Sequence, residues 1–369
     1  MDFDTAILKN EERITFALRS LYARFGYVQY KMSKFEEYEL YMNNKDFLIS
    51  SDVISFTDTN GRLMALKPDV TLSIVRASRP GPGLVQKVYY DENVYRISKS
   101  SRSFREIRQV GLECIGDVDD YCIGEVLTLA CESLRMIWPE HRLNLSHLGI
   151  VGAILDDLGL RGEARKQAVK FIGEKNLHEL AALCRENGAQ DEALQRLEKL
   201  VSCSGAPEAV LPALRALGCD EAAVGQLEAL AALLAANGVL KSVNIDFSVL
   251  SDMSYYNGIA FKGFVAGVPA AVISGGEYDK LLSRMGKPGG AIGFACYLDQ
   301  LERLDLGEAP LDVDTVLLYD AGCDPLRVAA AVRALRAEGC SVAAQKALPD
   351  KLRYRRALKL TESGVSELA

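Results

Sequence analysis

The chain has 369 residues, 49% of them hydrophobic and 25% charged, which is enough apolar material for a sizeable core and enough length for two or three domains. Its formal net charge of -7 at pH 7 argues against nucleic acid as the main partner, because Lys and Arg contacts to phosphates supply most of that affinity. Its 9 Cys form no CxxC pair and its 3 His show no metal-ligand spacing. We therefore expect free thiols in a reducing cytoplasm, with no metal or other cofactor.

The opening residues MDFDTAILKN carry early acids and no long apolar stretch, so we expect no signal peptide. The apolar run near residues 227–240 is interrupted by Glu228 and Asn237 and is too short to span a bilayer. Both observations predict a cytoplasmic protein without a membrane partner.

The first predicted element is a helix that ends at Gly26. Its apolar residues recur at the spacing of one helix face: Ile14, Leu18, Leu21, Tyr22 and Phe25. Next, SFTD and RLMAL flank the turn Thr59-Asn60-Gly61, a pattern typical of a β-hairpin. A longer strand pair is predicted around Val88–Ile97 and Glu106–Ile115, joined by a loop rich in Ser and basic residues.

From about Leu155 to Asn237 the chain is rich in Ala, Leu, Glu and Lys, which predicts several short helices with breaks at Gly205–Pro207 and Gly218. Strand character returns at VNIDF and over Gly258–Ile273. Near the C-terminus, VLLYD, PLRVAAAVRALRAEG and CSVAAQ predict a strand, a helix and a strand. The predicted plan is therefore α+β: an antiparallel sheet interrupted by a helical insertion, followed by a small α/β unit.

The strand RQVGLECIG carries the most informative polar pattern. Because side chains alternate between the two faces of a strand, Gln109, Gly111 and Glu113 share one face and the apolar residues between them share the other. The polar face places an amide and a carboxylate beside a glycine gap that a ligand could approach closely. A half-solvated sheet without a ligand is the alternative interpretation of this strand alone.

A second candidate is the segment MALKPDVTLSIVR. Pro68 before Asp69 predicts a strand that ends in a turn, and Asp69 suits the N-cap of the helix that follows. Capping alone is one interpretation of Asp69. The other is that its carboxylate and the Thr71 hydroxyl bind an α-ammonium group.

Three further stretches each have a structural and a functional interpretation. The paired tyrosines of SDMSYYNGIAF fit a core in which one hydroxyl reaches a polar partner. Gly275-Gly276 in SGGEYDKLL ends a strand where a backbone can approach a ligand. The basic loop forms either a solvated face or a contact for an anion, a nucleic acid or a partner chain. Its members are Lys99, Arg102, Arg105 and Arg108.

Taken in order, these pieces resemble the catalytic core of class II aminoacyl-tRNA synthetases, specifically the histidyl-tRNA synthetase type. KPDVT is similar to the family's R-P-E-G-T, VYRISKSSRSFREIRQVGLECIG to its motif 2, SYYNG to D-Y-Y-T-G, GGEYD to G-G-R-Y-D and AIGFACYLDQL to its motif 3. We read the last stretch, Ala291–Leu301, as the start of an amphipathic helix behind a glycine turn. The resemblance implies a synthetase-like antiparallel sheet flanked by helices over residues 1–305, a helical insertion at about 155–240, and a truncated anticodon-binding-like α/β unit over 310–369.

The resemblance also implies a pocket for free histidine. Asp69 and Thr71 hold the α-ammonium group, and tyrosines surround the imidazole, for which a carboxylate and hydroxyls are suitable partners. The implied histidine-binding residues are Asp69, Thr71, Arg96, Gln109, Glu113, Tyr255, Tyr256 and Tyr278.

The nucleotide half of the synthetase site is not retained in the sequence. Gln300 and Ser251 replace arginines that neutralise the triphosphate, and GGEYD adds the carboxylate of Glu277 in place of a third arginine. Tyr297 crowds the site, and Ser98 stands where an acid reads adenine. Removing one charge-stabilising donor typically costs ~100- to 1000-fold in rate, so these replacements leave no adenylation chemistry.

A histidine pocket without ATP activation is similar to that of the ATP phosphoribosyltransferase regulatory subunits of histidine biosynthesis. In that family the chain has no catalysis of its own: it assembles with a short catalytic subunit as a hetero-octamer, activates it, and mediates feedback inhibition by L-histidine. A dimer of the chain itself is also implied, although Ser33 replaces the proline usual after the first helix. The alternatives are a divergent histidyl-tRNA synthetase, which ATP–pyrophosphate exchange detects, and a tRNA-binding pseudo-synthetase, which salt-sensitive tRNA binding detects.

Overall fold

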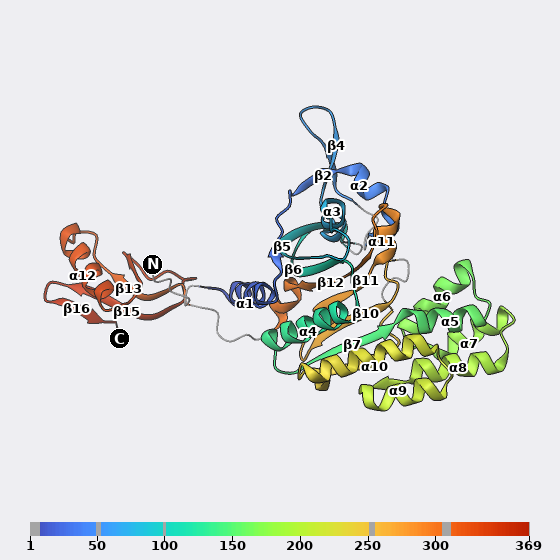
Figure 1. Ribbon diagram of the computed structural model, residues 1–369. Helices are drawn as coiled ribbons and strands as arrows, with labels where there is room; N and C mark the ends of the chain where they lie inside the picture. Colours follow the sequence, from blue (N-terminus) through green and yellow to red (C-terminus); the bar gives the residue numbers. More distant parts are fainter. Residues whose placement is uncertain (1–7, 49–52, 99–100, 251–254, 305–310, 369) are drawn as a thin grey trace. The chain divides into compact units, whose positions relative to one another are not determined.

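The computed structural model describes residues 8–48, 53–98, 101–250, 255–304 and 311–368 (Figure 1). By their internal contacts, the described residues divide into two compact units, one spanning Glu11–Leu304 and one that contains the residues from 311 on. Both units combine helices and strands, which confirms the predicted α+β class.

The core of the first unit is a sheet of nine strands among the described residues, in the order β1-β5-β6-β12-β11-β10-β7-β9-β8. From β5 through β7 every neighbouring pair is antiparallel, whereas β1 is parallel to β5 and β9 is parallel to β7. In sheet order the strands are β1 (Val28–Gln29), β5 (Val85–Ile97), β6 (Phe104–Gly116), β12 (Gly290–Tyr297), β11 (Ile273–Glu277), β10 (Ile259–Val265), β7 (His141–His147), β9 (Val243–Asp246) and β8 (Ser204–Gly205).

Strands β5 and β6 form the long hairpin that the sequence predicts. Their register places Glu113 of β6 opposite Val88 of β5. On its other side β6 pairs with β12, where Glu113 lies opposite Gly293. Because alternate residues of a strand point to opposite faces, Gln109 and Glu113 share one face of the sheet, as predicted.

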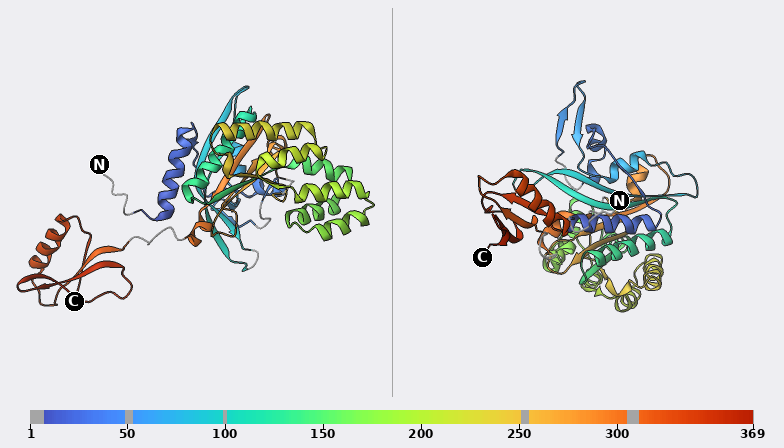
Figure 2. Two further views of the ribbon diagram at one scale, coloured as in Figure 1. Left: turned by 90° about the horizontal axis from the view of Figure 1, so that it is seen from below. Right: turned by 90° about the vertical axis from the view of Figure 1, so that its left-hand side faces the viewer.

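Two helices, α1 (Asn10–Arg24) and α4 (Asp120–Ile137), lie side by side across one face of this sheet (Figure 2). Tyr22 of α1 is fully buried, and its hydroxyl lies 3.0 Å from the Ser133 hydroxyl of α4. The α1 helix ends before Gly26, whose φ of +82° lies in the left-handed region that favours glycine. The helical spacing in the sequence therefore predicted α1 correctly.

A separate sheet of three described strands, in the order β2-β4-β3, contains the predicted short hairpin. Strands β3 and β4 pair antiparallel across a turn at Gly61, whose φ is +80°. Helix α3 begins directly after the KPDV stretch. The elements of this region are β2 (Phe35–Glu37), α2 (Tyr38–Met42), the 3-10 turn η2 (Lys45–Phe47), β3 (Ser55–Thr57), β4 (Leu63–Leu66) and α3 (Thr71–Ala77).

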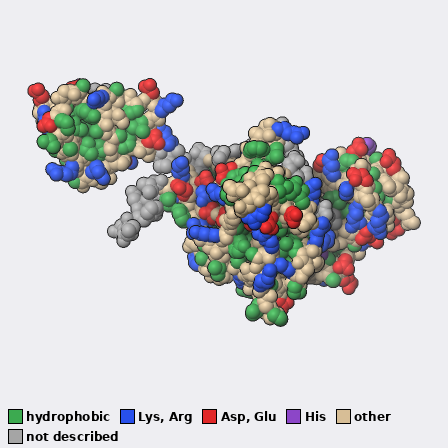
Figure 3. All heavy atoms as spheres, turned by 90° about the horizontal axis from the view of Figure 1, so that it is seen from above, with side chains coloured by type: hydrophobic (Ala, Val, Ile, Leu, Met, Phe, Trp, Pro, Cys, Tyr) green, Lys and Arg blue, Asp and Glu red, His purple; other side chains and the backbone are tan. Residues whose placement is uncertain are grey.

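Between β7 and β9 the chain is almost entirely helical, as the composition predicts. Asp220 caps the last of these helices by accepting a hydrogen bond from the Ala223 backbone N–H at 2.9 Å. Acidic and basic side chains intermingle over the surface of this segment (Figure 3), in pairs such as Arg165 with Asp156. The helices are α5 (Leu148–Asp157), α6 (Gly162–Gly173), α7 (Leu177–Glu186), α8 (Asp191–Ser202), α9 (Pro207–Ala216), α10 (Glu221–Ala236) and the 3-10 turn η3 (Leu240–Ser242).

The stretch Ala291–Leu301 departs from its prediction. Instead of starting a helix, its first residues complete the strand β12, and the 3-10 turn η4 (Leu298–Arg303) follows. The helix prediction is wrong because a short apolar run has no periodicity that separates a buried strand from a buried helix. Pairing with β6 on one side and β11 on the other makes the stretch a central strand.

The second unit is a small α/β structure with the strand order β14-β13-β15-β16. Strands β13 and β14 are parallel and are joined by α12, which confirms the predicted strand–helix–strand pattern. Strands β15 and β16, for which no signal was recognised in the sequence, extend the sheet beyond β13. The elements are β13 (Val313–Leu318), α12 (Pro325–Ala337), β14 (Val342–Gln345), β15 (Tyr354–Thr361) and β16 (Gly364–Glu367).

Candidate functional site

A cavity of about 360 Å³ lies over strands β5, β6, β12, β11 and β10 of the large sheet. It opens on the face away from α4: a Cβ on Gly263 would come within 2.8 Å of the Leu134 side chain of α4, so the neighbouring Lys262 points to the opposite face. The structure brings together every predicted histidine-binding residue in the lining of this cavity. They are Asp69, Thr71, Arg96, Gln109, Glu113, Tyr255, Tyr256 and Tyr278.

Glu113 lies at the buried end of the cavity, with 2% of its surface exposed. One carboxylate oxygen accepts a hydrogen bond from the Thr71 hydroxyl at 2.7 Å, and the other accepts one from the Tyr278 hydroxyl at 2.5 Å. A Cβ at position 293 would lie 1.8 Å from the second oxygen, so Gly293 provides the space for this carboxylate. Burial raises the pKa of Glu113 to about 8, although the two hydroxyl hydrogen bonds favour the ionised form.

Asp69 combines the two roles that the sequence left open. Its Oδ1 accepts a hydrogen bond from the Leu72 backbone N–H at 2.9 Å, which caps the start of α3. The same side chain lines the cavity and is 7% exposed. Burial raises the pKa of Asp69, whereas the Leu72 hydrogen bond and the nearby Arg96 guanidinium lower it. The Arg96 Nε donates to the Pro68 carbonyl oxygen at 3.0 Å, which ties the KPD segment to β5.

The tyrosines form an aromatic wall of the cavity. The ring centroids of Tyr255 and Tyr256 are 4.6 Å apart, and those of Tyr255 and Tyr278 are 5.9 Å apart. Gly276 lies beneath the Tyr256 ring, because a Cβ there would approach a ring carbon to 2.7 Å. Burial raises the pKa of all three phenols well above 10, so they present neutral hydroxyls at physiological pH.

The lining also includes residues that sequence reasoning missed. Tyr90 of β5 is fully buried, and its hydroxyl fills the predicted glycine gap, since a Cβ on Gly111 would lie 2.4 Å from it. That gap therefore holds a side chain of the protein, which corrects the expectation that a ligand enters it. Lys262 and Ser274 line the cavity from β10 and β11. A lysine inside the otherwise apolar strand IAFKGFV was the signal that could have found Lys262.

Of the residues expected to disable a triphosphate site, only some lie where the sequence suggested. Tyr297 lines the cavity, whereas the Gln300 amide turns to Asp299 and donates to its carboxylate at 3.1 Å. Ser251 lies outside the described residues. Ser98 lies at the end of the β5–β6 hairpin, where its backbone N–H donates to the Ser103 carbonyl at 2.9 Å.

The prediction that Glu277 adds a carboxylate to the triphosphate site is wrong. Glu277 alternates with the cavity-lining Ser274 and so points to the opposite face of β11. There it accepts a hydrogen bond from the Ile259 backbone N–H, and a Cβ on Gly258 would collide with its carboxylate. Burial raises the pKa of Glu277 to about 7. The motif alignment could not show this, because it does not specify which face a strand residue occupies.

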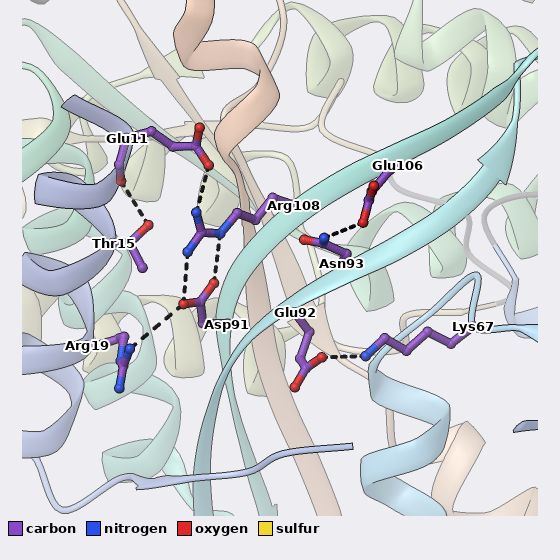
Figure 4. Close-up of polar contacts among 9 residues, drawn as sticks. All are labelled: Glu11, Thr15, Arg19, Lys67, Asp91, Glu92, Asn93, Glu106 and Arg108. Atoms are coloured by element: carbon purple, nitrogen blue, oxygen red, sulfur yellow. Dashed lines mark hydrogen bonds and ion pairs between the residues drawn. The ribbon is translucent and has the colours of Figure 1, made fainter. Parts of the chain in front are cut away.

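The basic loop does not form a single basic surface. Arg108 is held by Asp91 at 3.0 Å and by Glu11 at 3.0 Å, which places it in an ion-pair group with Arg19 between β5, β6 and α1 (Figure 4). Arg102 and Arg105 are exposed, and Lys99 lies outside the described residues.

The same close-up shows a second ion pair, between Lys67 and Glu92 (Figure 4). The fully buried Lys67, which directly precedes the Pro68-Asp69 pair, donates to Glu92 of β5 at 2.5 Å. This pair braces the segment that carries Asp69.

The described residues contain neither a cluster suited to a metal ion nor a helix suited to a membrane. No group of three or more His, Cys, Asp and Glu side chains in that part of the chain is arranged to hold a metal ion. No helix in the described ranges is long and apolar enough to cross a membrane. Chemically, the cavity combines two buried carboxylates, two cations and several phenol hydroxyls, which suits a small polar molecule that carries both N–H donors and charge.

Known proteins are similar to this chain over most of its length. The chain matches the family model described as histidyl-tRNA synthetase over residues 1–301. It is 32% identical over 345 residues to a protein of Moorella thermoacetica named ATP phosphoribosyltransferase regulatory subunit, covering 91% of this chain and 87% of that one.

Solved structures show the same fold. A crystal structure of an ATP phosphoribosyltransferase regulatory subunit/histidyl-tRNA synthetase from Bacillus halodurans C is similar with a TM-score of 0.74 and 27% identity, covering 91% of this chain and 88% of that chain. A chain of the ATP phosphoribosyl transferase (HisG:HisZ) complex from Thermotoga maritima has a TM-score of 0.62 at 21% identity, covering 78% of this chain and 97% of that chain. The predicted synthetase-like architecture is thereby confirmed.

Proposed function

This chain belongs to the family of ATP phosphoribosyltransferase regulatory subunits, and on that premise we propose that it binds L-histidine in the cavity over its sheet and transmits this binding to a catalytic phosphoribosyltransferase subunit. Without histidine the chain activates its short catalytic partner. With histidine bound, it inhibits that partner, which is feedback inhibition by the end product of the pathway. It acts in the cytoplasm within a hetero-oligomer, a hetero-octamer by family resemblance, in which it also contacts a second copy of itself.

The arrangement around Glu113 carries the proposal. A buried carboxylate is costly unless it is paired, and among the described residues each oxygen has one neutral hydroxyl as its partner. Asp69 adds a second buried carboxylate to the same cavity. A ligand that brings an ammonium group and an imidazole N–H supplies the donors and the positive charge that this end lacks. Free histidine carries both groups.

The surrounding tyrosines favour an imidazole over an aliphatic side chain. Neutral phenol hydroxyls donate to or accept from either ring nitrogen, and aromatic faces pack against a planar ring. Asp69 and Thr71 at the start of α3 are placed for the α-ammonium group. Arg96 beside Asp69 limits the negative charge of this end.

Regulation requires that the histidine cavity of this chain be coupled to the substrate site of the catalytic subunit, through the arrangement of the chains in the complex. Effector coupling is typically ~1–3 kcal/mol, which corresponds to about 5- to 150-fold in affinity, and it is reciprocal by thermodynamic necessity. The substrates of the catalytic subunit must therefore change the affinity of this chain for histidine by the same factor. Two comparisons support a catalytic phosphoribosyltransferase subunit as the partner. One relative is named ATP phosphoribosyltransferase regulatory subunit, and one similar solved structure is an ATP phosphoribosyl transferase (HisG:HisZ) complex.

Titration calorimetry with L-histidine tests the proposal, first on the chain alone and then on its complex with a short catalytic subunit. We expect one histidine per copy of this chain, and an affinity that changes when the substrates of the partner are added. If L-histidine binds to neither preparation, the proposed site is wrong. If it binds with one affinity under all conditions, the site stands and the coupling is refuted. Histidine-dependent ATP–pyrophosphate exchange by the pure chain is expected to be absent.

A further inference from the structure

Lys262 is a positively charged residue of the cavity that is not among the predicted histidine-binding residues. It lies in the middle of β10, is half-buried and lines the cavity. Within the described part of the chain, no hydrogen bond or ion pair reaches its ammonium group. Two other lysines near the sheet behave differently: Lys67 pairs with Glu92 at 2.5 Å, and Lys87 pairs with Glu125 at 2.6 Å.

The surroundings of Lys262 favour an anion as its partner. Burial lowers the pKa of Lys262, and no carboxylate among the described residues opposes that shift. Opposite Lys262 on β7, the Asn144 Oδ1 is buried and has no hydrogen-bond partner. A half-buried ammonium beside an unpartnered amide is a polar environment that the protein itself leaves incomplete.

The floor of the cavity connects this cation to the carboxylate end. One register row across the sheet runs from Gly111 through Ala295 and Ser274 to Lys262. The side chains of Ala295 and Ser274 in this row are small, and the aromatic groups beside the row are the Tyr256 ring over Gly276 and the Tyr90 hydroxyl at Gly111. Neighbouring strands lie ~4.8 Å apart, which puts the axis of β10 about 14 Å from that of β6, and the long side chains of Glu113 and Lys262 both extend into this space.

We propose that Lys262 binds the carboxylate of the effector and thereby makes the cavity select an amino acid over the corresponding amine. This inference rests on the proposed function, because it assigns the remaining charged group of the same ligand. The end with Asp69 and Glu113 recognises the nitrogen atoms, and the Lys262 end recognises the acid. Lys262 is then a specificity-determining residue that no motif of the synthetase resemblance includes.

Calorimetry with L-histidine and with histamine, which lacks only the carboxylate, tests this assignment. We expect the unmodified chain to prefer L-histidine by about 10- to 100-fold, the range for a charged hydrogen bond. Lys262→Met is expected to lower the affinity for L-histidine to that for histamine and to leave histamine binding unchanged. Lys262→Arg keeps the charge and is expected to retain part of the preference. Lys241→Met, at an exposed position of η3, is the control and is expected to change neither affinity.

The possible outcomes separate the inference from its premise. Equal weakening of both ligands by Lys262→Met, or an unchanged affinity for L-histidine, overturns the role of Lys262 while the histidine site stands. Binding of neither ligand by the unmodified chain refutes the proposed function itself. Inorganic phosphate is the remaining probe: if it binds through Lys262 without competing with L-histidine, the residue holds a free anion and the inference is wrong. Competition with L-histidine but not with histamine supports it.

Discussion

Glu113 and Glu277 lie on opposite faces of the same sheet, and burial raises the pKa of both, to about 8 and about 7. Glu113 accepts hydrogen bonds from the hydroxyls of Thr71 and Tyr278 and faces the cavity. Glu277 accepts from the backbone N–H of Ile259 on the face toward α4.

The difference between these two carboxyl groups is the mobility of their donors. A hydroxyl rotates about its own bond, so Thr71 and Tyr278 can turn to a bound ligand when it replaces them at Glu113. The Ile259 N–H belongs to a strand and cannot turn away. Glu113 is therefore suited to exchange partners, whereas Glu277 fixes the start of β10. A raised pKa alone does not separate a binding group from a structural one.

The largest expected effect is on histidine affinity. Glu113→Gln keeps the size of the side chain but cannot ionise when a cation binds, and we expect it to weaken L-histidine binding by about 10- to 100-fold. Glu277→Gln, the matched change on the other face, is expected to leave the affinity within about twofold. Calorimetry on both variants, after circular dichroism has shown that each is folded, makes the comparison. If the two variants weaken L-histidine binding equally, the conclusion that only the Glu113 face of the sheet binds the ligand is wrong.

A second prediction concerns the space beside Glu113. Gly293→Ala places a methyl group 1.8 Å from the carboxylate and 2.5 Å from the Leu112 carbonyl oxygen, so we expect it to destabilise the fold by about 1–3 kcal/mol. Gly225→Ala in α10 is the control, because a Cβ there meets nothing within 4 Å. It is expected to be neutral or to stabilise by about 0.4–1 kcal/mol. Urea unfolding measures both, and a stable Gly293→Ala chain would contradict the packing at this site.

A third prediction uses pH. Because the pKa of Glu113 rises from 4.5 to about 8 on folding, the folded chain holds an extra proton between these values, and stability falls as pH rises through that window. We expect the free energy of unfolding to fall by about 1 kcal/mol across this window, which lowers the unfolding midpoint by roughly 2–4 °C. The loss is modest because water that reaches the site reduces the cost of ionising Glu113. The Glu113→Gln chain is expected to lose this part of the pH dependence.

Histidine sharpens the same measurement. A bound cation favours the ionised form of Glu113. Saturating L-histidine is therefore expected to remove the contribution of Glu113 to the pH dependence of stability. The share of Glu277, whose pKa is raised to about 7, is expected to remain. Thermal scans of the unmodified chain between pH 5 and pH 9, with and without ligand, supply both curves. A ligand that leaves the slope unchanged argues against contact with Glu113.

The smallest effect is expected in the ion-pair group between β5, β6 and α1. Asp91→Asn removes the carboxylate that pairs with Arg108 at 3.0 Å and with Arg19 at 4.0 Å. These are partly exposed pairs, so a loss of about 0.5–1 kcal/mol in stability is expected, with no change in histidine affinity. A large loss of affinity would mean that this side of the hairpin also shapes the cavity.

Much of the candidate site was predictable from the sequence. The alternation in RQVGLECIG placed Gln109 and Glu113 on one face, and the order of the short motifs added the residues of α3 and the tyrosines. The errors share one cause. Glu277, the stretch after Gly290 and the gap at Gly111 all depended on which neighbouring strand or side chain occupies a face, and a motif read along one chain does not contain that information.

Local periodicity and short motifs were enough to predict the α+β class and the order of the elements, and the resemblance to synthetases implied eight of the residues that line the cavity. Contacts in three dimensions were needed to show that residues 290–297 form a central strand, that Glu277 points away from the cavity and that Lys262 points into it with no partner among the described residues. The physical reason is that strand pairing and the choice of face are settled by contacts between residues far apart in the chain.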